Sequence, residues 1–248
     1  MNVALAAAAT LVAVAFALST LDRWLRRGQP HELAWTVSLL LFAVGSLALW
    51  WSQSTGWSLG AFRVFYIAGA VLNVPWLALG TVYLLAGTAA GNRARGWLVL
   101  LSGLTVGVVG FAPTRGKVHG FELPTGKEVF GVAPRVLAAV GSGVAAAVII
   151  LGAVWSAWRV RRGMTPSFGT QRARPAARRL VAGNLLIAGG TLVLSASGTI
   201  AGRLGKDRAF AITLLVGISV LFAGFLVASA PAKQPRKVRA GCGAAASR

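Results

Sequence analysis

Seven apolar stretches, each close to 20 residues long, constrain the fold of this chain more than any other feature. They cover residues 2–20, 33–51, 62–87, 97–113, 136–158, 180–200 and 209–229. A helix of about 20 residues crosses the hydrocarbon core of a bilayer and satisfies its own backbone hydrogen bonds there. Only 12% of the 248 residues are charged, and all five acids lie outside these stretches. The sequence therefore predicts an all-α, polytopic bundle of seven transmembrane helices over residues 1–230, followed by a basic, disordered cytoplasmic tail over residues 231–248.

The lysines and arginines predict how this bundle is oriented. With the N-terminus outside, 17 of the 25 basic residues fall in segments on the cytoplasmic side and eight fall on the outer side. Short cytoplasmic loops of membrane proteins carry an excess of lysine and arginine. We therefore expect the N-terminus outside, the C-terminus in the cytoplasm and a multi-pass protein of a bacterial plasma (inner) membrane.

The net charge of +20 would suggest nucleic-acid binding in a soluble protein. Here the charges lie in short segments between apolar stretches, where they fix topology and contact anionic lipid headgroups at the inner face. We expect the bilayer as the main partner and no nucleic acid. The inner loop 159–179, which carries seven arginines, and the basic tail leave a cytoplasmic protein partner as an open alternative.

The third apolar stretch holds the polar side chains best suited to a site inside the membrane. At 100° per residue, one stripe of this helix carries two phenols, an amide and an indole. These candidate cavity residues are Tyr66, Asn73, Trp76 and Tyr83. Pro75 removes a backbone hydrogen bond beside Asn73 and predicts a kink. The buried amide and the freed carbonyl predict a small ligand pocket, and the alternative is an interhelical hydrogen bond that serves packing. We expect Asn73→Leu to disturb function or stability more than Asn184→Leu, and equal stability and activity of the two variants would count against the pocket.

No catalytic, metal or cofactor site is predicted. The chain has two histidines and one cysteine, Cys242 in the tail, so clustered metal ligands are lacking. No acid, base or histidine falls at the centre of a predicted span, where proton-coupled pumps need one. The seventh span has no lysine for a retinal Schiff base. We therefore expect a protein that is not an enzyme.

The outer loop 114–135 is the longest segment predicted outside the membrane. Val118 to Leu123, a Pro-Thr-Gly-Lys turn and Glu128 to Phe130 together predict a strand, a turn and a second strand. A small hairpin over the bundle would act as a lid or a partner-binding tip. The alternative is a simple connector between two helix ends.

The stretch from Gly56-Trp57 through Phe62-Arg63, Phe65-Tyr66 and Gly69-Ala70 to Leu79–Leu85 resembles a group of uncharacterised multi-spanning membrane proteins of GC-rich bacteria. The resemblance covers mainly the second and third spans and implies a plasma-membrane location, with no activity attached. The seven-helix layout also resembles the membrane sensor modules of histidine kinases, although this chain carries no kinase. We expect a non-enzymatic, sensor-like or accessory membrane component. The alternative is a facilitator of a small uncharged or weakly polar solute.

Overall fold

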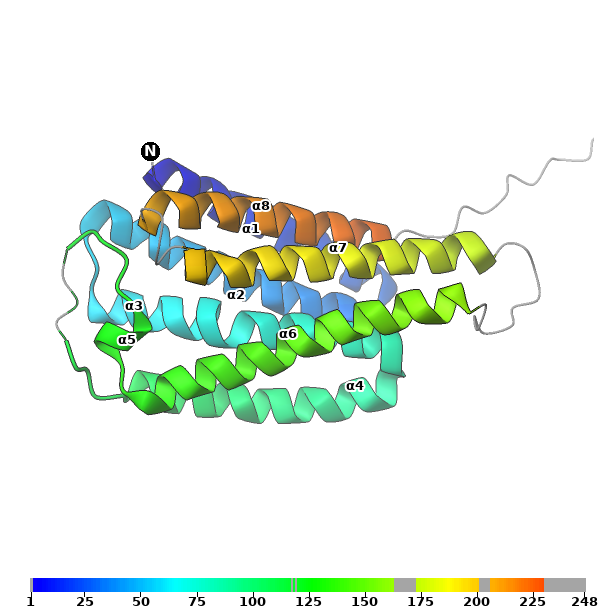
Figure 1. Cartoon of the computed structure of the whole chain (residues 1–248), viewed down its shortest axis with the longest axis horizontal. Coiled ribbons are helices and arrows are strands. Elements are labelled where there is room, and N and C mark those ends of the chain that lie inside the picture. Colours follow the sequence, from blue (N-terminus) through cyan, green and yellow to red (C-terminus); the bar gives the residue numbers. More distant parts are fainter. Residues whose placement is uncertain (1, 117, 119, 163–172, 201–205, 230–248) are drawn as a thin grey trace, which may run out of the picture.

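The computed structural model describes residues 2–116, 118, 120–162, 173–200 and 206–229. The long helices lie side by side along one axis (Figure 1). The elements are α1 (Asn2–Arg27), α2 (Pro30–Thr55), α3 (Leu59–Phe65), the π-helix η1 (Tyr66–Leu72), α4 (Asn73–Gly110), α5 (Gly126–Val129), α6 (Val132–Arg161), α7 (Ala173–Ile200) and α8 (Lys206–Ser229). Over the described residues the fold is helical throughout, with one isolated bridge and no strand, which confirms the all-α prediction.

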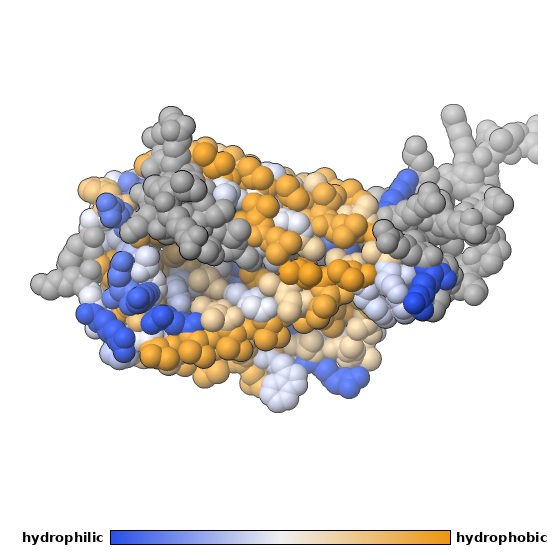
Figure 2. Space-filling view, in the orientation of Figure 1, coloured by the Kyte–Doolittle hydropathy of each residue, from blue (hydrophilic) through white to orange (hydrophobic). Residues whose placement is uncertain are grey.

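Four helical segments are long and apolar enough to cross a membrane. They are Val3–Arg27, Pro30–Thr55, Leu59–Gly110 and Val132–Arg159. The described parts of α7 and α8 contain shorter apolar helices, Val181–Leu194 and Ile212–Ala228. Hydrophobic side chains cover the middle of the bundle, and hydrophilic ones gather toward its two ends (Figure 2). This distribution is typical of a membrane protein.

The segment Leu59–Gly110 reverses direction at Gly87, where φ is 84° and ψ is 178°. Two side-chain hydrogen bonds join the helix before Gly87 to the helix after it. Tyr83 Oη donates to Asn92 Oδ1 at 2.9 Å, and Trp76 Nε1 donates to Ser102 Oγ at 3.3 Å. The two halves of α4 therefore lie antiparallel (Figure 1). The positive φ explains the glycine, because residues with a Cβ rarely adopt it.

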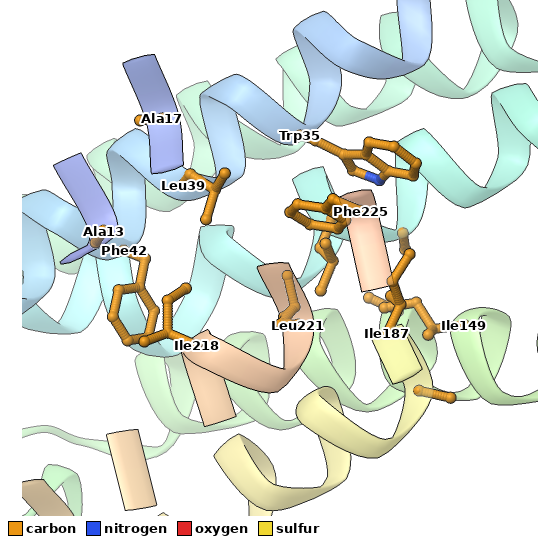
Figure 3. Close-up of a cluster of buried hydrophobic side chains, with 14 of the residues drawn as sticks. Ala13, Ala17, Trp35, Leu39, Phe42, Ile149, Ile187, Ile218, Leu221 and Phe225 are labelled. Atoms are coloured by element: carbon orange, nitrogen blue, oxygen red, sulfur yellow. The ribbon is translucent and has the colours of Figure 1, made fainter. Parts of the chain in front are cut away.

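The largest hydrophobic cluster lies where α1, α2, α4, α6, α7 and α8 meet. Trp35 of α2 and Phe225 of α8 stack face to face at its centre, with ring centroids 4.5 Å apart (Figure 3). Gly80 of α4 lies against the indole of Trp35, so closely that a Cβ there would overlap the ring. A missing side chain on α4 thus makes room for the bulkiest side chain of the core.

Glycines also bring α7 and α8 into close contact. A Cβ on Gly190 of α7 would lie 2.8 Å from the backbone nitrogen of Leu221. A Cβ on Gly224 of α8 would lie 2.9 Å from the carbonyl oxygen of Gly183. Small residues of this kind let helix backbones approach each other in lipid, where no hydrophobic effect drives helices together.

The outer loop differs from the predicted strand–turn–strand. Residues 126–129 form the helical turn α5, and the described residues of the loop show one isolated bridge, between Thr114 and Phe130, and no strand. Glu128 explains the difference, because its carboxylate accepts a hydrogen bond from the backbone nitrogen of Thr125 at 3.0 Å. Thr125 and Glu128 together form a capping box, which favours a helical start over an extended strand. The prediction of a second strand was therefore wrong.

Candidate functional site

Tyr66, the first residue of η1, lies directly beneath the outer loop. Its ring meets the edge of Phe130 at a centroid distance of 5.0 Å and lies 5.9 Å from the ring of Phe62. Gly126 of α5 packs so closely that a Cβ there would come 2.8 Å from the ring of Tyr66. Arg63 adds a second link, since its Nη2 donates to the carbonyl oxygen of Ala112 at 2.8 Å. The loop is therefore seated on the start of the π-helix.

Asn73 lies at the other end of η1 and is hydrogen-bonded to α2. The hydroxyl of Ser38 lies 2.8 Å from Oδ1 of Asn73 and 3.0 Å from its backbone carbonyl oxygen. Asn73 is buried, with 8% of its surface exposed. This geometry is the interhelical hydrogen bond that the sequence left open as the alternative to a pocket.

The distortion predicted from Pro75 is realised upstream, as the π-helix between Tyr66 and Leu72. The backbone N–H of Asn73 donates to Ala68, five residues earlier, which is the π-helical register. A carbonyl in this segment also accepts a hydrogen bond from a neighbouring helix: Ser142 Oγ of α6 donates to the oxygen of Ala70 at 2.6 Å. At the i−5 spacing of a π-helix, the carbonyl of Ala70 would accept from residue 75, where proline has no N–H, so the hydroxyl of Ser142 takes the place of that donor.

Trp76 and Tyr83 complete the predicted stripe, and both bond to the second half of α4 through Ser102 and Asn92. The four candidate residues therefore have four different partners. They are spread over roughly 25 Å of helix, at about 1.5 Å per residue. Tyr66 contacts the outer loop through its ring, and the other three side chains join α4 to α2 and the two halves of α4 to each other through hydrogen bonds.

A cluster of charged residues at the turn between α1 and α2 was not predicted from the sequence. Glu32 is 1% exposed, and its Oε1 lies 3.7 Å from Nη1 of Arg27. Its Oε2 has no hydrogen-bond partner among the described residues, nor do Nε and Nη2 of Arg23. His31 packs against Trp35 at a ring distance of 5.2 Å, which connects this cluster to the hydrophobic core. The available signal was the position of Glu32, immediately before an apolar stretch and in the first turn of α2, where the helix dipole favours an acid.

Asn184 of α7 is a second residue that the sequence undervalued. It is 2% exposed, and within the described part of the chain neither its Oδ1 nor its Nδ2 has a hydrogen-bond partner. Asn73, in contrast, has a partner for its side-chain oxygen. A buried amide without partners costs free energy, so Asn184 marks a weak point of the packing or a place for a polar group from outside the chain.

The described residues contain no group of three or more His, Cys, Asp or Glu side chains arranged to hold a metal ion. Comparisons with protein families, with curated proteins and with solved structures find no match to this chain.

Proposed function

We propose that this chain is a seven-helix protein of a bacterial plasma membrane and acts there as a non-enzymatic, sensor-like or accessory component. In this proposal α1, α2, the two antiparallel halves of the segment Leu59–Gly110, α6, α7 and α8 each cross the bilayer once. The reversal at Gly87 supports this count, because it divides the longest apolar segment into two helices.

The ends of the bundle support the proposed orientation. The start of α1 and the outer loop lie at one end, and the α1–α2 turn, Gly87 and the end of α6 lie at the other (Figure 1). This second end carries Arg26, Arg27, Arg93 and Arg95, followed by Arg159 and Arg162 of α6. An excess of arginine favours the cytoplasmic side. The N-terminus is then outside and the C-terminus in the cytoplasm.

One observation carries the sensor-like function: the outer loop sits on Tyr66, and Tyr66 begins the only π-helix of the described chain. Each backbone hydrogen bond of a π-helix spans five residues instead of the four of an α-helix, and such segments are frequent at functional sites. At its far end the backbone is held by hydroxyls of Ser38 on α2 and Ser142 on α6. A displacement of the loop would therefore change the hydrogen bonds between three helices.

Hydrogen–deuterium exchange of the full chain in lipid nanodiscs tests this coupling. We expect Tyr66→Leu to speed exchange of backbone amides in η1 and also in α6 around Ser142. Phe121→Leu is the matched control, because Phe121 lies in the same loop and is 63% exposed. Faster exchange confined to the loop and Tyr66, with α6 unchanged, would contradict the sensor-like proposal.

The membrane location and the rival function have separate tests. The protein should stay with the membrane fraction after carbonate washing, and a reporter fused after Arg248 should be cytoplasmic. Proteoliposomes should take up glycerol and urea no faster than protein-free liposomes. Faster uptake of either solute would support the facilitator and overturn the sensor-like proposal.

A further inference from the structure

An open groove of about 740 Å³ runs between the first half of α4 and α6. Its lining is almost entirely apolar. The lining residues are Thr81, Val82, Leu85 and Ala86 of α4, and Val148, Leu151, Gly152, Val154, Trp155 and Trp158 of α6. On α6 the lining extends from Val148 to Trp158, which corresponds to about 15 Å along the helix axis. The groove is thus elongated and parallel to the bundle.

The two helices touch at Gly152, below the groove. A Cβ there would lie 2.8 Å from Cδ1 of Leu85 and 3.1 Å from Cγ2 of Thr81. The side chains on the open side are exposed, with 67% of Leu151 and 43% each of Trp155 and Trp158 accessible. An apolar surface of this shape on a membrane-spanning bundle is complementary to a hydrocarbon chain.

Two arginines, Arg159 and Arg162, lie at one end of the groove. This is the end of the bundle that also carries Arg26, Arg27, Arg93 and Arg95. The guanidinium carbon of Arg159 lies 4.8 Å from the ring centroid of Trp155, and that of Arg162 lies 4.2 Å from that of Trp158. No salt bridge joins either arginine to a carboxylate in the part of the chain that the structure describes. The indoles hold the two guanidinium groups at the mouth of the groove while leaving their N–H donors open to an anion.

We propose that the groove holds an acyl chain of an anionic phospholipid and that Arg159 and Arg162 bind the phosphate of its headgroup. This inference rests on the proposed membrane location and orientation. Such a lipid is complementary to the groove in both of its parts. Its acyl chain matches the apolar groove in the hydrocarbon region, and its phosphate matches the two guanidinium groups beside the interfacial tryptophans. Anionic lipids are concentrated in the cytoplasmic leaflet, which the proposed orientation places at this end.

The test is a lipid titration of the full chain in a mild nonionic detergent, followed by native mass spectrometry and thermal unfolding. The probes are dioleoylphosphatidylglycerol and dioleoylphosphatidylcholine. We expect the protein to bind dioleoylphosphatidylglycerol more tightly than dioleoylphosphatidylcholine. We also expect the phosphatidylglycerol to raise the Tm more. The double variant R159Q/R162Q should weaken this binding on the order of tenfold, because it removes two charge-assisted hydrogen-bond donors.

Two matched controls separate a built site from general attraction. R93Q/R95Q removes the same charge from exposed positions at the same end of the bundle and should change binding less than twofold. V148W fills the groove and should displace the lipid. V140W places the same side chain on an exposed position two turns away on α6 and should not.

Three outcomes would overturn the proposal. Equal losses in R159Q/R162Q and R93Q/R95Q would show diffuse electrostatics, and equal binding of the two lipids would show a non-specific acyl contact. A dimer that V148W dissociates would show that a second copy of the chain fills the groove. If the lipid titration succeeds while the C-terminal reporter is periplasmic, only the proposed orientation fails. If both the lipid titration and carbonate retention fail, the membrane location itself is wrong.

Discussion

The hydroxyl of Ser38 lies 2.8 Å from Oδ1 of Asn73 and 3.0 Å from the carbonyl oxygen of the same residue. One hydroxyl group on α2 thus faces both the side chain and the backbone of the residue that ends the π-helix. In a bilayer the competition from water is weak, so a helix pair keeps such a bond once it has formed.

Ser38→Ala should lower the free energy of unfolding by about 1–2 kcal/mol, because it leaves the buried Oδ1 of Asn73 without a partner. Denaturation in detergent measures this change. Ser54→Ala on the same helix is the control, since that exposed hydroxyl bonds only to the carbonyl of Trp50 in its own helix. In a double-mutant cycle, Ser38→Ala and Asn73→Leu should cost less together than the sum of the two single changes. If the double variant lost as much stability as the two single variants together, the bond between Ser38 and Asn73 would not contribute to stability.

Gly80→Ala should destabilise the bundle by about 1–3 kcal/mol, because the new Cβ would overlap the indole of Trp35 and force α2 and α4 apart. Thermal unfolding of the purified protein measures this loss of stability. Gly103→Ala is the matched control, because nothing lies within 4 Å of a Cβ at that position. Alanine favours a helix interior over glycine, so this control should be neutral or slightly stabilising. A Tm for Gly80→Ala equal to that of the control would show that the indole is free to move aside.

Gly87→Ala should cost about 1–2 kcal/mol through the backbone alone. A Cβ at Gly87 meets no atom within 4 Å, but φ is 84° there. Gly96→Ala, nine residues further on, also has open space and no positive φ, so it isolates the backbone term. Chemical denaturation should separate the two variants clearly, and identical unfolding curves would mean that the turn tolerates a side chain.

Glu32→Ala should destabilise the protein by about 1–3 kcal/mol, because it removes the buried carboxylate that faces Arg27 and leaves the buried Nε and Nη2 of Arg23 without a nearby negative charge. Asp22→Asn breaks the exposed pair with Arg26, whose two side chains are 56% and 76% accessible, and should cost at most about 1 kcal/mol. Unfolding by detergent titration compares the two variants. Similar midpoints would show that the Glu32 cluster is hydrated and contributes little.

The apolar stretches predicted where helices form, because their length and lack of charge leave few other structures in lipid. Pro75 likewise predicted a distortion of the third stretch. The sequence did not predict which side chains donate hydrogen bonds to the distorted segment. Ser38 and Ser142 are more than 30 residues away on either side, and only tertiary packing brings them to the π-helix. Their hydroxyls carry no distinctive pattern in the sequence.

The structural roles of two glutamates were not predicted from the sequence. Val129 and Phe130 favour a strand, yet the carboxylate of Glu128 caps the turn that begins at Thr125, and the helical turn forms instead. Glu32 lies outside the predicted apolar stretches, as expected, yet it is buried beside Arg27 at the end of α1. A charge beside a hydrophobic segment is therefore an ambiguous signal, since neighbouring helices decide whether it meets water.

The single-residue reversal at Gly87 constrains how the protein is made. With no extended loop between the two halves of α4, neither half can settle across a bilayer while the other remains in solution. The bonds from Tyr83 to Asn92 and from Trp76 to Ser102 hold the two halves together. In the proposed topology these two helices would insert as one unit, and a long tag placed at residue 87 would separate them.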